Sequence, residues 1–330
     1  MVEYYDVNRE FLDCDDFIVG DVRVGSHRHL MFATPTQLRL LQQARRWYCD
    51  GTFKIRREPF QQLWSIHAFL QQDGCTKQVP LCFVLMSRRT AEDYEAVLRH
   101  LLTCFESSPE VEGFMLDFEA GCWRAVRSVF PGVDLKGCSF HWAQAVLRKV
   151  DSLGLRATFR KRQGVAEYIR KLMALPFLPS PQIHDAFVKL KRLANTPELT
   201  QLVDYLDRYW FRSGVWSTAN WCVHRQSVRT NNDVEGWHRR INTKARRANL
   251  PFYMLVPLLH QEGRLVTLQM RLVAEQALRR QQTTVYRRIQ GKIQTLWDQY
   301  AEQEISSSTF LKTVGKIYCP ATVRPTPDDE

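Results

Sequence analysis

The chain has 330 residues, of which 45% are hydrophobic and 25% are charged, and this ordinary globular composition excludes a disordered or low-complexity protein. No apolar stretch approaches the ~20 residues of a membrane-spanning helix, and the acidic N-terminus lacks the features of a secretory signal or a transit peptide. Lysine and arginine exceed aspartate and glutamate by 46 to 35, a net charge of +11, which suits either a polyanionic partner or simply a basic surface.

The nine cysteines predict reduced thiols. Their number is odd, and most lie in apolar segments such as VPLCFVLM. A disulfide framework needs paired cysteines in an oxidising compartment, so we expect free thiols in a reducing one.

The first part of the chain predicts one helix followed by three strands. A Thr-Pro start and apolar residues at helical spacing predict a helix over 35–46. The period then changes to β-branched and aromatic runs separated by turn residues. These runs predict an antiparallel meander of three strands, over 47–55, 61–71 and 78–86.

Helices and strands alternate after this meander. Thr90 followed by Asp93 is the pattern of a capped helix, which we expect over 90–106. The next segments predict a strand at 113–119, a helix at 120–130, a strand at 135–142 and a further helix. This order predicts an α/β fold with a mixed sheet, three antiparallel strands followed by parallel ones, flanked by helices.

Three acidic residues occupy unusual settings. Asp50 lies inside a predicted strand, where an unpaired carboxylate loses solvation. Asp117 closes the apolar strand GFMLDFE, and Glu235 follows TNND at the start of a predicted helix. Asn231 or Asn232 can cap this helix, and a carboxylate is favoured near its positive end.

The predicted topology brings two of these acids together. The first and fourth strands are natural neighbours, so Asp50 and Asp117 can face each other. Two adjacent carboxylates repel unless a divalent cation lies between them, and their oxygens suit Mg²⁺ or Mn²⁺. Glu235 could complete a two-metal site that activates water or a 3′-hydroxyl against a phosphodiester. Each acid taken alone is more simply explained as a surface or turn carboxylate, but three of them in this β-β-β-α-β-α order are much harder to explain by chance.

Five segments carry a family resemblance. They occur in one order across residues 30–265: RRWYCDGTFK, QLWSIHAF, LDFEAGCWRAVRSVFP, GCSFHW and TNNDVEGWHRRIN. Together they resemble the catalytic region of MULE (Mutator-like element) transposases, which are DDE enzymes with an RNase H-like core. The resemblance implies that Asp50, Asp117 and Glu235 are the catalytic triad and hold two Mg²⁺ or Mn²⁺ ions.

The same resemblance implies an organisation for the chain. Asp117 and Glu235 are 118 positions apart, which leaves room for an all-helical insertion before the last acid. The expected parts are an N-terminal extension (1–45), the first part of an RNase H-like core (46–149), a helical insertion (150–225), C-terminal helices completing the core (226–305) and a flexible tail (306–330).

Cys138, His141 and His238 are candidate auxiliary residues. Cys138 and His141 match the C-x-x-H element of the family, but structural zinc needs four ligands, and Cys222, His224 and His238 are the available partners. The alternative is a buried cysteine with a histidine that orients the active site. His238 lies on the same helix face as Glu235, where it could lie near the scissile phosphate, donate to a carboxylate or simply be solvated.

A basic run follows the third acid. It is a candidate DNA-binding surface that would neutralise phosphates, and the alternative is a solvated helix face. The run consists of Arg239, Arg240, Lys244, Arg246 and Arg247.

These observations predict a nuclear DDE-type transposase catalytic domain that performs metal-dependent DNA strand cleavage and strand transfer. Its partners would be transposon ends and target DNA. A homo-oligomer is possible, and no membrane association is expected. Because no C-x₂₋₄-C…H-x₃₋₅-H pattern precedes Asp50, the alternative is a transposase-derived nuclear factor that binds DNA or protein without catalytic turnover. A generic RNase H-like nuclease is a third reading, which TNNDVEGWH disfavours.

Overall fold

The computed structural model describes residues 14–72, 75–275 and 284–318. The chain divides into two units, each with its own core. In the described part, the first unit combines residues 14–135 and 231–275, and the second combines residues 136–230 and 284–318. Each unit is therefore built from segments that are distant in sequence, with the second unit interrupting the first. None of the described helices has both the length and the hydropathy needed to span a bilayer.

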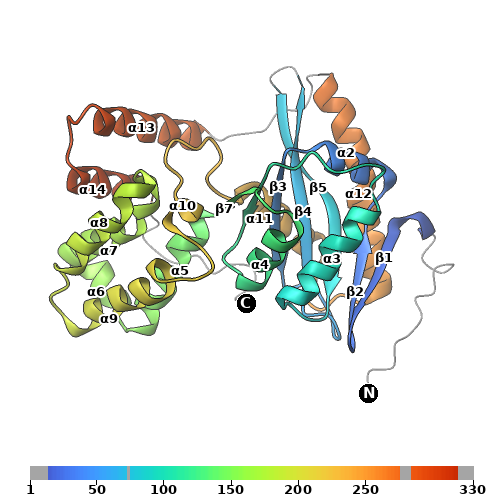
Figure 1. Ribbon diagram of the computed structural model, residues 1–330, viewed down its shortest axis with the longest axis horizontal. Helices are drawn as coiled ribbons and strands as arrows, with labels where there is room; N and C mark the ends of the chain where they lie inside the picture. Colours follow the sequence, from blue (N-terminus) through green and yellow to red (C-terminus); the bar gives the residue numbers. More distant parts are fainter. Residues whose placement is uncertain (1–13, 73–74, 276–283, 319–330) are drawn as a thin grey trace. The chain divides into compact units, whose positions relative to one another are not determined.

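The first unit is built on a seven-stranded mixed sheet in the order β1-β2-β5-β4-β3-β6-β7 (Figure 1). Neighbouring strands from β1 to β3 pair antiparallel, whereas β3 pairs parallel with β6. This confirms a mixed sheet with antiparallel strands followed by a parallel one. The strands are β1 (Ile18–Val24), β2 (His27–Phe32), β3 (Arg46–Thr52), β4 (Gln62–Gln72), β5 (Cys75–Met86), β6 (Gly113–Leu116) and β7 (Asp134–Gly137).

Most elements predicted for this unit are confirmed. The meander is β3, β4 and β5, and the helix expected over 35–46 is α2 (Pro35–Gln43). In α3 (Ala91–Thr103), Thr90 and Asp93 form the expected reciprocal cap. The segment expected as an N-terminal extension (1–45) contributes the hairpin of β1 and β2, which adds two strands at the β5 edge of the sheet.

The strand expected at 135–142 is shorter than predicted. β7 ends at Gly137, and Cys138 takes the N-cap position of α5 (Ser139–Ser152). Trp142 donates its backbone N–H to Cys138 and is fully buried together with Val146. The aromatic residues that suggested a strand therefore belong to the buried face of a helix, at helical spacing.

Helices cover both faces of the sheet. Side chains alternate along β4, so Trp64 packs against Tyr94 of α3, whereas His67 packs against Trp237 on the opposite face. α4 (Ala120–Val129) packs with α3, and α11 (Asn232–Ala245) and α12 (Phe252–Ala274) form the other layer. The active-site candidates lie on the α11 face.

The second unit is helical in its described part. Arg229 is 1% exposed in its core, and its guanidinium lies over the rings of Phe177, Trp297 and Tyr318. Its helices are α5, α6 (Arg156–Lys161), α7 (Gln163–Met173), α8 (Ser180–Lys191), α9 (Pro197–Leu206), α10 (Thr218–Trp221), α13 (Thr284–Ala301) and α14 (Ser307–Tyr318), with short helical turns at Asp15–Phe17 in the first unit and at Leu175–Phe177 and Asp207–Phe211 in the second.

Part of the segment 306–330, which was expected to be a flexible tail, is helical. Residues Ser307–Tyr318 form α14, and residues 319–330 lie outside the described part. Phe310 and Val314 are fully buried, and Gly315 allows α14 to approach the backbone carbonyl of Arg170 in α7. α13 also belongs to the helical unit, whereas the sequence interpretation had assigned it to the core.

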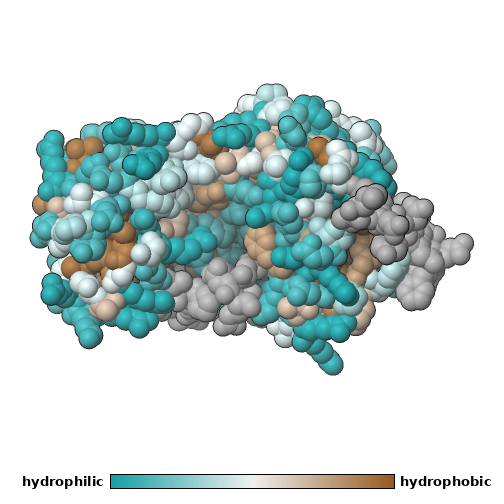
Figure 2. Space-filling model, turned by 90° about the horizontal axis from the view of Figure 1, so that it is seen from below, coloured by the Kyte–Doolittle hydropathy of each residue, from teal (hydrophilic) through white to brown (hydrophobic). Residues whose placement is uncertain are grey.

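The surface seen in Figure 2 is mostly hydrophilic, with hydrophobic residues in small scattered groups. The cysteines in the described segments form no disulfide, which agrees with the expected thiols, and Cys319 lies outside those segments.

A test of α14 is to truncate its buried ring. Phe310→Ala is expected to lower the free energy of unfolding by about 3 kcal/mol, because it leaves a cavity between packed helices. Leu193→Ala removes a side chain that is 63% exposed and should change stability little. Equal effects of the two variants in denaturant titrations would contradict the packing of α14.

Candidate active site

The strand register places two of the predicted acids side by side. β3 and β6 are parallel, with Tyr48 opposite Met115. Continuing this register by two residues puts Asp117, which directly follows β6, opposite Asp50. Asp50 also pairs with Ser65 of β4, so its side chain faces α11. The predicted juxtaposition of the two strands is therefore present in the sheet.

The carboxylates of Asp50 and Asp117 both influence the pKa of the Cys49 thiol. Burial raises the pKa of the Cys49 thiol well above its usual range, and the charges of Asp117 and Asp50 raise it further. Asp50 is only 5% exposed. The backbone carbonyl of Asp117 accepts a hydrogen bond of 2.6 Å from the indole of Trp123 in α4. Negative charge is thus concentrated at this edge of β3, and α4 fixes the backbone that carries the second acid.

Glu235 lies in the first turn of α11, and this helix is tied to β3. The Asn231 side-chain amide donates to the backbone carbonyl of Cys49 at 3.3 Å, next to Asp50. Asn231 occupies the N-cap position expected for it, but its side chain spans to β3 instead of capping the helix. The half-buried Glu235 carboxylate therefore enters from a helix anchored beside the first acid, at the positive end of the helix dipole.

A buried chain of polar side chains runs behind Asp50. His238 is 4% exposed, and its Nδ1 lies 3.9 Å from Asp50 Oδ2. Its Nε2 lies 3.3 Å from Ser65 Oγ, which lies 2.9 Å from His67 Nε2. His238 is thus held between Asp50 and Ser65. A ring that is 4% exposed does not fit the reading of His238 as a solvated side chain.

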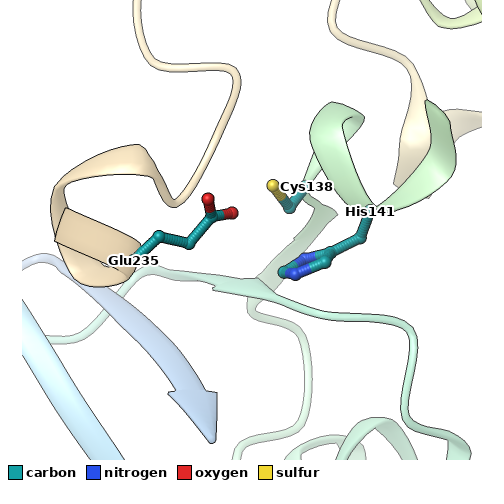
Figure 3. A group of neighbouring side chains, drawn as sticks. All are labelled: Cys138, His141 and Glu235. Carbon is teal, nitrogen blue, oxygen red and sulfur yellow. The ribbon is translucent and has the colours of Figure 1, made fainter. Parts of the chain in front are cut away.

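Cys138 and His141 come from the start of α5, in the second unit (Figure 3). The Cys138 sulfur and a ring nitrogen of His141 lie within 4.8 Å of each other. Burial lowers the pKa of His141 to about 4, with the nearby Arg148 adding to the shift. The imidazole is therefore neutral at pH 7, which is the form that binds a metal. Figure 3 also labels Glu235, which α11 of the first unit carries.

The other zinc partners suggested by the sequence have different contacts. The Cys222 thiol donates to the backbone carbonyl of Leu178 at 3.2 Å, and the His224 ring packs edge-on against Trp297. Within the described part of the second unit, these contacts leave Cys138 and His141 as two ligands, where structural zinc needs four.

The basic run divides into two groups because of an acid that the sequence interpretation did not single out. Glu262 of α12 is 1% exposed and accepts hydrogen bonds from Trp237 (2.8 Å), Arg240 (2.5 Å) and Lys244 (2.6 Å). Burial alone would raise the pKa of this carboxyl, but Lys244, Arg240 and Trp237 lower it. Arg240 and Lys244 thereby tie α11 to α12.

A signal for Glu262 was present in the sequence. It stands in the segment LVPLLHQEGRLV, at helical spacing from Leu255, Leu259 and Val266, which are all buried. A carboxylate on an apolar helix face needs a cationic partner. The remaining members of the basic run, Arg239, Arg246 and Arg247, line a cavity with Lys54.

Glu262→Gln should destabilise the first unit. The substitution keeps the shape but leaves two cations without a buried counter-charge, so the free energy of unfolding is expected to fall by about 2–3 kcal/mol. The exposed ion pair of Glu112 with Arg45 provides a control, since Glu112→Gln should change stability by less than about 1 kcal/mol. Chemical denaturation of the three proteins measures both effects, and equal stabilities would contradict the role of Glu262.

The buried histidine His67 predicts a pH dependence of stability. Burial, followed by the charges of His238 and Arg240, lowers its pKa well below 6.5. Below pH 6.5 the unfolded chain binds a proton that the folded chain excludes, so the free energy of unfolding falls as the pH decreases.

In His67→Gln this acid-side slope should be smaller, by up to about 1.4 kcal/mol per pH unit. The exposed His184→Gln is the control. Urea titrations between about pH 7 and pH 5 measure the slopes, and an unchanged slope in His67→Gln would rule out this contribution.

Comparisons with known proteins support the family resemblance. Residues 46–145 match the family model described as the MULE transposase domain. The matched segment begins at β3, ends within α5 and includes Asp50 and Asp117. The curated proteins contain no match to the chain. The match indicates a transposase-type function, and it confirms the resemblance of this part of the chain to the MULE transposase family.

Proposed function

We propose that the first unit is the RNase H-like catalytic core of a DDE-type transposase, which acts in the nucleus on transposon ends and target DNA. The observation that carries this proposal is the register of β3 and β6, which sets Asp117 opposite Asp50 inside the segment that matches the MULE transposase domain. A transposase domain implies DNA as the partner.

The proposed site suits a hard divalent cation. Asp50 is almost fully buried next to a second carboxylate, an arrangement that is costly without a compensating positive charge. Asp50, Asp117 and Glu235 would supply only oxygen ligands, which Mg²⁺ and Mn²⁺ prefer. Two bound ions would lower the pKa of an attacking water or 3′-hydroxyl and stabilise the leaving oxygen of the phosphodiester.

The surrounding side chains have positioning roles in this proposal. His238 fixes the orientation of the Asp50 carboxylate, and Ser65 in turn holds the His238 ring. The hydrogen bond from Asn231 to Cys49 fixes where α11 begins relative to β3, and this fixes the position of Glu235. Pre-positioned ligands of this kind reduce the reorganisation needed when substrate binds.

The alternative is a transposase-derived factor that binds DNA or protein without turnover. It shares the fold and the basic surface with the first proposal, and it differs in making no use of the acids. The two proposals therefore give opposite expectations for substitutions that remove a carboxylate charge without changing its shape.

The test is a calorimetric titration of Mn²⁺ into the wild-type protein and into the Asp50→Asn/Asp117→Asn double variant. The wild type is expected to bind Mn²⁺ and the double variant is not, because both substitutions replace a charged carboxylate ligand of the same site by a neutral amide. Strand cleavage of duplex DNA in Mn²⁺ should be lost in Asp50→Asn.

The control is Glu112→Gln, which removes an exposed carboxylate of the same unit. It should bind Mn²⁺ and cleave DNA as the wild type does. Cleavage that persists in Asp50→Asn would overturn the assignment of the acids. DNA binding and a cellular role that survive Asp50→Asn and Glu235→Gln, without cleavage by any variant, would favour the binding factor.

A further inference from the structure

A basic cavity lies along the C-terminal half of α11. Its volume is about 430 Å³. Its lining is entirely polar or charged, and all of it belongs to the first unit. The lining residues are Lys54, Arg239, Asn242, Thr243, Arg246 and Arg247.

The sequence builds this cavity from one helix face and one tethered loop. Arg239, Asn242, Thr243 and Arg246 have the spacing i, i+3, i+4 and i+7, which places them on one side of α11. Lys54 comes from the segment after β3, and its carbonyl accepts the backbone N–H of Asn249 at 2.9 Å. Leu250 makes a similar bond to Ile55. The loop after α11 is thereby fixed beside Lys54.

The cations in this cavity differ from their neighbours on the same helix. Arg240 and Lys244 are paired with Glu262. Across the described segments, by contrast, Lys54, Arg239 and Arg246 form no ion pair with an acid. Arg246 also ends the helix in the left-handed conformation, with φ of 59°. The cavity therefore gathers uncompensated positive charge.

Asn242 gives a second and independent indication of a ligand. Its side chain lines the cavity and is only 9% exposed. Both its amide nitrogen and its amide oxygen are buried without a hydrogen-bond partner in the described structure. Leaving such a group unsatisfied costs about 1–3 kcal/mol. A bound anion would accept a hydrogen bond from the amide nitrogen and remove part of this cost.

We propose that this cavity, the α11 phosphate pocket, binds a phosphodiester of the DNA backbone. Three guanidinium groups and an ammonium group match the charge and the oxygen acceptors of a phosphate. Arg247 is the least available of the four, because it also contacts the Met254 sulfur at 3.1 Å. The pocket makes no use of base edges, so it contributes affinity and register but no sequence preference.

The position of the pocket on α11 predicts which phosphate it holds, and this step rests on the proposed function. Arg239 and Arg246 follow Glu235 by four and eleven residues, or about 6 and 16 Å along the helix axis. One DNA strand advances ~3.4 Å per nucleotide. For a duplex whose axis runs along α11, the phosphate in the pocket would lie roughly two to five nucleotides from the one at the acids.

The test is binding of a labelled DNA duplex, measured by fluorescence anisotropy over a series of salt concentrations in EDTA. Arg239→Gln and Arg246→Gln should each weaken binding several-fold at low salt. The double variant Arg239→Gln/Arg246→Gln should reduce the slope of log K against log salt by about 0.9, because the pocket neutralises one phosphate, and each single variant should reduce it by less.

Asn242→Leu separates a ligand role from a structural one. It removes an unsatisfied buried amide without changing the charge, so stability should stay equal or rise. DNA affinity should fall while the salt slope stays unchanged. A stability change without any loss of affinity would overturn the role of Asn242.

The matched control is Arg271→Gln, which removes an exposed arginine near the far end of α12. It should bind DNA nearly as the wild type does. Pocket variants that bind no more weakly than Arg271→Gln would overturn the proposal, as would a wild-type protein that does not bind duplex DNA or that prefers duplex RNA.

These readouts are separate from catalysis because they need no metal. Glu112→Gln, which lies outside both sites, should retain pocket-dependent binding in EDTA. If the pocket variants lose binding but no protein cleaves DNA in Mn²⁺, then the pocket stands and the proposed catalytic function fails. If the wild type cleaves DNA and the pocket variants bind DNA normally, then the proposed catalytic function stands and the pocket proposal fails.

Discussion

The candidate site depends on the attachment of α11 to the sheet and to α12. One carboxylate, Glu262, is buried among three donors from α11, and one amide, that of Asn231, joins the start of this helix to β3. A buried carboxylate is stable only while its donors remain in place, so the attachment is cooperative. Glu235 and His238 both take their positions from it, and so does the α11 phosphate pocket.

Local sequence signals predicted much of the first unit. Thr90 with Asp93 set the start of α3, and the strand periodicity set β3, β4 and β5, because these features act within a few residues. The addition of the β1–β2 hairpin to the sheet and the helix α14 were missed. Phe310, Leu311 and Val314 of α14 do have helical spacing, but α7, against which this helix packs, is distant in the sequence, so the local pattern alone did not show that the helix is part of a core.

Only part of the candidate site could be predicted from the sequence. The neighbourhood of Asp50 and Asp117 followed from strand order, since topology alone restricts which strands can be adjacent. The division of the basic run did not follow, because the pairing of Arg240 and Lys244 with Glu262 joins residues about twenty positions apart on separate helices. The Ser65 and His238 contact spans 173 residues, and nothing in either local segment indicates it.

The division of the first unit into separate segments has a consequence for synthesis. A ribosome completes the sheet as far as β7 well before it reaches α11, and the whole segment 136–230 emerges in between. Until α11 and α12 emerge, the apolar face of β4 and β5 lacks the cover of Trp237 and Leu259. The nascent chain thus holds two of its three acids on an unfinished layer, and long-range closure of this kind makes folding slow.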